Sequence, residues 1–252
     1  MADFSAQVAL GESLTPVGQL RFTQTGPRQF STFTYDQEWS DNPQAFAIDP
    51  ALSLEGGPFH TSGKPGHMRD ALPGAFSDAA PDDWGRRLLE RAYGNGLSEF
   101  EYLTLSDDMC RQGALRFLDA DGAIIRGNAA DAVPRLVELE NITAIARAYE
   151  QGKELSAEDM QALAGAGGSG GARPKANVRD GDALWLAKFT SVHDQRPIER
   201  VEVATLRLAR ACGIRTPEVR LELPDSPFPV ALIERFDRRG SARIPYISAR
   251  TA

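Results

Sequence analysis

The chain has 252 residues, of which 42% are hydrophobic and 25% charged, a composition suited to one large globular domain or two smaller ones. Its formal net charge of -7 excludes a globally basic surface for nucleic acid, so any DNA contact has to be local or made through a partner. The two cysteines, Cys110 and Cys212, are too far apart in sequence to suggest a disulfide framework or a zinc site. Because the sequence shows no leader pattern and no apolar run of about 18 residues, we expect a cytoplasmic protein without membrane contact.

The first 80 residues are predicted to contain short strands followed by loops. Three runs alternate apolar and polar residues and are separated by turn residues, which is the pattern of half-buried strands. These runs span 7–10, 17–24 and 29–35. Residues 51–80 contain two glycine-rich stretches and are predicted to form mostly loops.

Helices are predicted to dominate the next 80 residues. Pro81 lies near the first turn of a segment in which acidic residues precede basic ones, and Gly94 supplies a C-terminal stop. Ser156 is followed by acidic residues, as at the start of a helix that runs to about Leu163. The other elements expected here are a helix at 98–106, a short strand with an Asp-Gly turn at 113–122 and a helix at 134–150.

The composition changes abruptly after Leu163, where the chain continues with AGAGGSGGARPKANV. An apolar run and a helical spacing of apolar residues follow this glycine-rich segment, and two further strand patterns are joined by a proline-rich turn. These elements are a buried strand at 183–190, a helix at 198–212 and strands at 218–223 and 229–236.

The order of these last elements suits an enzyme that handles phosphate groups. Glycines at 165–171 let backbone amides approach phosphate oxygens closely. Lys188 lies near the end of the following strand and can neutralise phosphate charge, while Glu202 on the next helix can hold this lysine, as in protein kinases. The strand that ends in ERF can offer backbone groups to an adenine ring, as a kinase hinge does.

Each of these elements also has a simpler interpretation. A glycine-rich stretch can be a linker, a lysine after an apolar strand can be solvated, and Glu202 can be a surface residue of its helix. The glycine-rich segment matches neither standard phosphate-loop motif. Asp82 and Asp83 resemble a carboxylate pair, but acidic residues suit the first turn of a helix, and the three histidines form no ligand pattern. The ordered set favours a nucleotide site; a plain α+β protein with a glycine linker is the alternative.

The sequence resembles the HipA family over nearly the whole chain. The motifs GGARPKA (170–176) and ERFDR (234–238) carry most of the resemblance, and together they are fairly specific. The remaining similar segments are Val17–Leu20, Leu72-Pro73, Asp82–Arg87, Gly113–Phe117, Leu186–Phe189, Glu202–Gly213, Thr216–Glu218, Arg243, Pro245 and Ser248-Ala249.

This resemblance implies a bacterial serine/threonine kinase that is the toxin of a toxin–antitoxin pair. Such kinases use ATP and Mg²⁺ to phosphorylate a serine of a protein target, for which a tRNA synthetase is the known kind. They are neutralised by a helix-turn-helix antitoxin, so DNA is contacted only indirectly. The alternative is a non-catalytic N-terminal module that binds and regulates a toxin kinase or its antitoxin.

The resemblance also implies roles for individual residues. The glycine-rich loop would cover the phosphates, Lys188 would contact them, Glu202 would support Lys188, and backbone groups of Glu234 and Phe236 would bracket the adenine. The loop residues in question are Ser169, Gly170, Gly171 and Ala172. Ser169 is the candidate for regulatory autophosphorylation, although the family serine falls one place earlier, at Gly168, and Ser169 can instead be a simple loop former.

The expected fold is α+β. A β-rich HipA-like N-terminal subdomain (1–120) and a helical connection (121–163) precede a kinase-like small lobe of antiparallel strands and one helix (164–252). The family's catalytic aspartate and metal ligands come from a helical lobe that would follow Ala252. We therefore expect no catalytic residue and no metal ligand within the chain, and very low turnover by it alone.

Overall fold

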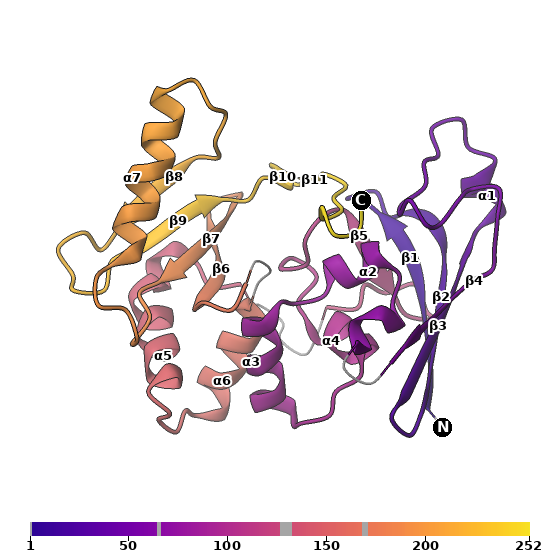
Figure 1. Ribbon diagram of the computed structural model, residues 1–252, viewed down its shortest axis with the longest axis horizontal. Helices are drawn as coiled ribbons and strands as arrows, with labels where there is room; N and C mark the ends of the chain where they lie inside the picture. Colours follow the sequence, from indigo (N-terminus) through magenta and orange to yellow (C-terminus); the bar gives the residue numbers. More distant parts are fainter. Residues whose placement is uncertain (1, 65–66, 127–132, 168–170) are drawn as a thin grey trace.

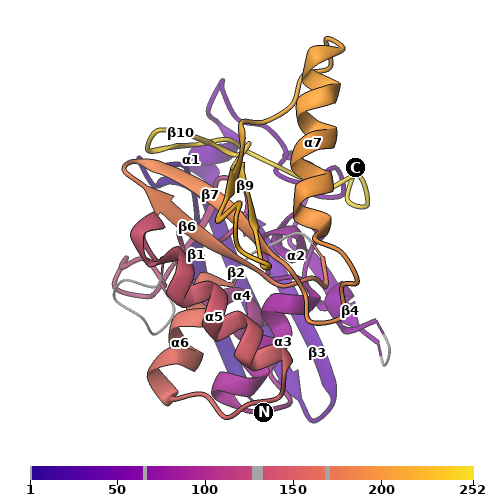
Figure 2. The ribbon, with the colours of Figure 1, turned by 90° about the vertical axis from the view of Figure 1, so that its left-hand side faces the viewer.

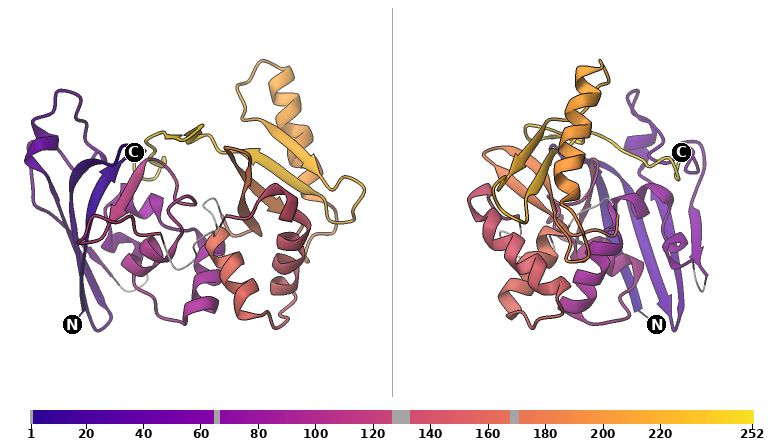
Figure 3. Two further views of the ribbon diagram at one scale, coloured as in Figure 1. Left: turned by 180° about the vertical axis from the view of Figure 1, so that it is seen from behind. Right: turned by 60° about the vertical axis from the view of Figure 1, so that its left-hand side comes forward.

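The computed structural model describes residues 2–64, 67–126, 133–167 and 171–252. Figure 1 shows two antiparallel sheets at opposite ends of the molecule, with most of the helices between them. The last residues of the chain cross back from the second sheet toward the first, so the C-terminus lies near β5. This return places segments that are far apart in sequence side by side, as the view from behind also shows (Figure 3).

The N-terminal sheet has five strands in the order β4-β3-β2-β1-β5. Side chains alternate along β2 and β3, so Leu20, Phe22 and Phe33 are buried while their neighbours face outward. Phe76 of α2 and Phe117 of β5 pack into the same core. The strands are β1 (Ala2–Leu10), β2 (Thr15–Thr25), β3 (Arg28–Tyr35), β4 (Phe59–Gly63) and β5 (Leu115–Leu118).

Short helical elements cover this sheet and connect it to the rest of the chain. They are α1 (Gln37–Ser40), the 3-10 turn η1 (Met68–Ala71), α2 (Gly74–Ala79) and α4 (Glu99–Leu105). Strand β4, η1 and α2 all lie within residues 51–80, which we predicted to form mostly loops. The pattern of β4 is weak because FHTSG forms an edge strand with no fully buried side chain, and it is held by its register with β3.

A second core lies between three helices and the C-terminal sheet. The helices are α3 (Asp83–Tyr93), α5 (Leu139–Glu150), which follows the 3-10 turn η2 (Leu136–Glu138), and α6 (Ala157–Ala166). Asp82 and Ser156 cap α3 and α6, because each side chain accepts a hydrogen bond from a backbone amide in the first turn. Trp84, Leu88 and Leu89 of α3 are buried in this second core, beside α6.

The C-terminal sheet has four strands in the order β6-β7-β9-β8, with a long helix beside it. Ala187 and Leu232 face α5 and α6, whereas Ala231 on the opposite face packs against Val203 of the helix, which stands out from the body in Figure 2. The elements are β6 (Lys175–Asp180), β7 (Ala183–Phe189), α7 (Ile198–Ala211), β8 (Val219–Glu222) and β9 (Val230–Glu234).

These two sheets and their helices confirm the predicted α+β fold. Strand β6 is a difference, since we predicted its residues as part of the glycine-rich segment. It alternates polar and apolar residues, but Lys175 and Asn177 are as buried as Ala176 and Val178. A short hairpin, β10 (Arg238–Arg239) and β11 (Ala242–Arg243), follows β9. Within the described residues, no helix combines the length and apolarity that crossing a bilayer requires.

Candidate functional site

Lys188 and Glu202 form an ion pair between β7 and α7. The distance from Lys188 Nζ to Glu202 Oε1 is 2.5 Å. The neighbours of Lys188 in β7, Ala187 and Phe189, are buried on one face of the sheet, so Lys188 lies on the opposite face, which α7 covers. Glu202 lies there, in the second turn of α7. The two side chains are 28% and 29% exposed, so the ammonium group is held in place and still reachable by a ligand.

The described part of the glycine-rich segment resumes at Gly171, which has a φ of 115°. A side chain at this position would meet open space, so glycine is required by the backbone conformation alone. Ala172 is exposed beside it. Ser169 and Gly170 lie outside the described residues, so the predictions made for them stay predictions.

Lys175 is a charged residue of this region that the sequence did not single out. Its side chain is 1% exposed, and Nζ donates to Asp82 Oδ2 at 2.8 Å and to the Gly171 carbonyl at 2.5 Å. It stands directly opposite Lys188 in the β6–β7 pair. Burial lowers the pKa of Lys175, the carboxylate of Asp82 opposes this, and Lys188 lowers the pKa further. GGARPKA contains this lysine, but nothing near it in sequence indicates its partner.

At the end of β9, one of the backbone groups that a nucleotide base would need is already hydrogen-bonded within the protein. The Glu234 amide donates to the Glu218 carbonyl at 2.9 Å, so this amide is not available to a nucleotide base. The Phe236 side chain is 56% exposed and lies edge-on to Tyr246, with 5.2 Å between the ring centroids. Lys188 and Glu202 therefore meet at the C-terminal sheet, and Gly171 lies just before its strand β6. The proposed adenine contacts stay predictions.

Two family models match the chain, and they belong to the same family. The model of the HipA N-terminal domain matches residues 6–117, and the model of the HipA-like C-terminal domain matches residues 167–252. The chain belongs to the HipA family. No curated protein matches it significantly. HipA membership relates the chain to serine/threonine toxin kinases, a family that uses ATP and Mg²⁺.

Three residues of the HipA motif ERFDR, namely Arg235, Asp237 and Arg238, form a buried charge cluster. Asp237 has no exposed surface and accepts hydrogen bonds from Arg235, Arg238 and the Gly113 amide at 2.6 to 2.8 Å. Burial alone would raise the pKa of Asp237, but these donors and charges lower it below its ordinary value. Arg235 also donates to the Cys110 carbonyl and Arg238 to the Gly113 carbonyl. The cluster therefore fixes the end of β9 against the segment that precedes β5.

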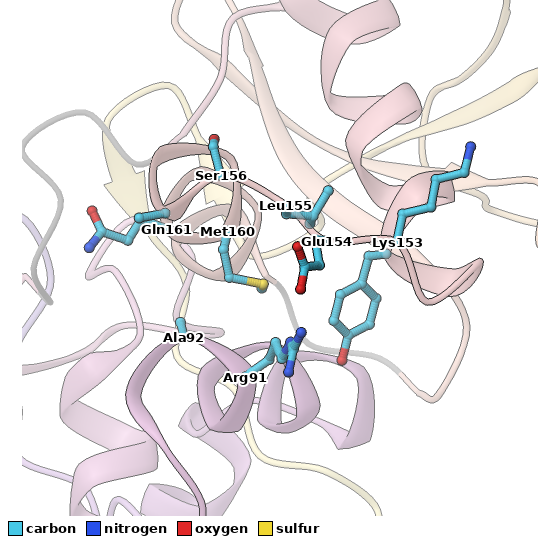
Figure 4. A pocket seen from close by; sticks show the side chains of 10 residues that line it. Arg91, Ala92, Lys153, Glu154, Leu155, Ser156, Met160 and Gln161 are labelled. Atoms are coloured by element: carbon cyan, nitrogen blue, oxygen red, sulfur yellow. The ribbon is translucent and has the colours of Figure 1, made fainter.

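Two cavities lie along α3, on the side of the helix that faces α5. One has a volume of about 360 Å³, and in Figure 4 Arg91 and Met160 point into it while the Lys153 ammonium points away. The other, of about 570 Å³, reaches Ala172 and includes Arg87 in its lining. Neither is lined by Lys188 or Glu202.

The arrangement fits the phosphate end of ATP. Lys188 supplies a positioned cation, and Gly171 begins an exposed backbone segment at the start of the same sheet. No group of three histidine, cysteine, aspartate or glutamate side chains that could hold a metal occurs among the described residues. The phosphate contacts of Lys188 and of the glycine-rich segment stay predictions.

Proposed function

We propose that the C-terminal part of the chain binds ATP and is the nucleotide-binding lobe of a HipA-type serine/threonine protein kinase. The observation that carries this proposal is the ion pair between Lys188 and Glu202, beside the glycine-rich segment. An ammonium group held by a carboxylate is fixed in its direction, which is what a phosphate-binding lysine needs. Bound ATP with Mg²⁺ would supply the phosphoryl group, and we assign no catalytic residue to residues 1–252.

Binding of ATP tests this proposal more directly than turnover does. Wild-type protein is titrated with a fluorescent ATP analogue in the presence of Mg²⁺, beside the variants Lys188→Ala and Glu202→Gln. We expect Lys188→Ala to weaken binding about tenfold or more, since it removes a charged hydrogen bond to phosphate of about 1.5–3 kcal/mol. Glu202→Gln keeps the shape of the side chain and should weaken binding less.

Lys153 offers a matched control for this experiment. Its side chain is exposed, and its ammonium group makes no hydrogen bond or ion pair with a described residue. Lys153→Ala should bind the ATP analogue as the wild type does. The proposal fails if the wild type shows no binding at millimolar nucleotide, or if Lys188→Ala and Lys153→Ala behave alike.

The wider role follows from the family and is part of the proposal. The partners would be a helix-turn-helix antitoxin, with DNA contacted only through it, and a protein substrate such as a tRNA synthetase. Ser169 is the proposed site of regulatory autophosphorylation. Mass spectrometry of phosphopeptides from protein purified from its host would test this site, and phosphate found only on other residues would exclude it.

A second candidate function is a non-catalytic module that binds a toxin kinase or its antitoxin. The observation in its favour is the apolar surface on and after α7, where Val201, Leu208 and Ile214 are 50%, 65% and 60% exposed. Exposed apolar side chains mark a protein contact where they form one contiguous patch, whereas single ones are normal. This candidate predicts a stable complex with such a partner together with no measurable binding of ATP.

A further inference from the structure

Helix α3 holds the end of the glycine-rich segment through two cationic side chains. Lys175 Nζ donates to the Gly171 carbonyl at 2.5 Å and is itself held by Asp82 Oδ2 at 2.8 Å. Arg87 Nη2 donates to the Ala172 carbonyl at 2.8 Å. Two consecutive carbonyl groups of the segment are therefore bound by cations that α3 carries or anchors.

The same helix also fixes the start of β6. Trp84 Nε1 donates to the Lys175 carbonyl at 2.8 Å, and the Trp84 ring is 2% exposed. Asp82, which caps α3, accepts from the Gly85 amide through Oδ1 while Oδ2 binds Lys175. Since Leu88 is also fully buried in the second core, α3 is a rigid support rather than a mobile one.

Peptide geometry gives these contacts a consequence for anion binding. In a trans peptide the carbonyl of one residue and the amide of the next point in opposite directions. Lys175, anchored by Asp82, and Arg87 of α3 bind the carbonyls of Gly171 and Ala172, and therefore turn the amides of Ala172 and Arg173 away from these cations. No described residue accepts a hydrogen bond from either amide. Successive amides that face one way form the kind of concavity that binds phosphate oxygens.

The two lysines beside this backbone have different carboxylate partners. Lys175 and Lys188 are cross-strand neighbours, so their ammonium groups repel each other. Asp82 neutralises Lys175, and Glu202 holds Lys188. The buried Lys175 is thereby occupied by Asp82 and the Gly171 carbonyl, whereas the partly exposed Lys188 remains for a ligand.

We propose that Asp82, Arg87 and Lys175 are positioning residues that set the direction of the backbone from Gly171 to Arg173, and with it the affinity for the phosphate groups of a nucleotide. This inference rests on the proposed nucleotide site and assigns a role in it to a helix outside the C-terminal lobe. It predicts that α3 affects phosphate binding and leaves binding of the nucleoside unchanged.

Arg87 gives the cleanest test because its side chain is exposed, so its removal leaves the fold intact. Arg87→Ala is compared with Arg91→Ala, one turn further along α3, where the side chain makes no hydrogen bond or ion pair with a described residue. Binding of ATP with Mg²⁺ and of adenosine is measured by calorimetry. We expect Arg87→Ala to weaken ATP binding about three- to tenfold, the effect of one net hydrogen bond, without changing adenosine binding. Arg91→Ala should change neither.

A second variant tests the buried pair. Lys175→Met combined with Asp82→Leu removes both charges together, so no unpaired charge is left buried. It should weaken ATP binding more than Arg87→Ala does, again without changing adenosine binding. Arg87→Lys keeps a donor for the Ala172 carbonyl and should restore part of the affinity.

Backbone ¹⁵N relaxation of the Ala172 and Arg173 amides separates this inference from the proposed function, because it reports backbone motion at amides that have no hydrogen-bond acceptor among the described residues. Lower order parameters in Arg87→Ala than in Arg91→Ala, together with the selective loss of ATP affinity, support the inference. Equal losses of ATP and adenosine affinity, or wild-type order parameters and affinity in Arg87→Ala, overturn it. If the wild type binds neither ligand, the proposed function fails, and the order parameters alone decide whether α3 holds this backbone.

Discussion

The buried cluster around Asp237 allows the sharpest test of how the two ends of the chain are joined. Asp237→Asn keeps the size of the side chain and removes its charge. Arg235 and Arg238 then face an amide that offers one acceptor oxygen in place of two, although their side chains stay only 6% and 9% exposed. Two guanidinium groups are therefore left buried with too few acceptors.

The burial of this cluster sets the expected cost. Removing one partner of a buried ion pair typically costs about 3–5 kcal/mol, and the oxygen that asparagine retains places this variant near about 3 kcal/mol. At roughly 2–4 °C per kcal/mol for a protein of this size, the midpoint of thermal unfolding should fall by about 6–12 °C.

An exposed pair of the same length provides the control. Asp180 Oδ2 lies 2.6 Å from Arg220 Nη1, and these side chains are 38% and 44% exposed. Asp180→Asn should cost about 0–1 kcal/mol, because water competes for both charges. Urea unfolding of both variants at neutral pH measures the two costs. If they agree within about 0.5 kcal/mol, burial does not govern the strength of the Asp237 cluster, and our reasoning is wrong.

Two further predictions concern titration and thiol chemistry. The pKa of Asp237 is lowered in the folded state, so its contribution to stability is present above about pH 4 and is lost as the pH falls through the folded pKa. The free energy of unfolding in urea should therefore decline in acid, and it should decline less steeply in Asp237→Asn. Parallel curves for the two proteins would contradict this. Burial raises the pKa of Cys110 to about 12, whereas Cys212 is exposed, so a thiol reagent should modify one cysteine in the native protein and two after unfolding. Cys212→Ser should abolish the native reaction, and rapid modification of both thiols would refute the burial of Cys110.

The sequence predicted most elements whose signals are local. The strands β1 to β3 alternate apolar and polar residues, and α6 begins directly after Ser156, as predicted. Helix α3 begins at Asp83 with Asp82 as its cap, slightly later than the predicted first turn at Pro81. The sequence order also suggested that Glu202 holds Lys188, and the structure places the two side chains in contact between β7 and the second turn of α7. Their role toward a nucleotide stays a prediction.

Residues with distant partners could not be placed in this way. Lys175 and Asn177 occupy buried positions of β6, and polar residues at such positions do not resemble a strand core. Asn177 is satisfied by the Ala166 carbonyl and by Arg235, which is 58 residues away in the chain. A polar residue can be buried only where such acceptors and donors converge, and the sequence does not show where they converge.

The sequence by itself determined the α+β composition and the family motifs, and it suggested that Glu202 holds Lys188. The tertiary structure alone decided that α3 supports this segment, because the partner of Lys175 is Asp82, 93 residues earlier. It also decided that Asp237 joins the end of β9 to the Gly113 amide, across 124 residues. The physical reason is that buried charges must be compensated at short range in space, whereas no rule fixes their separation along the chain.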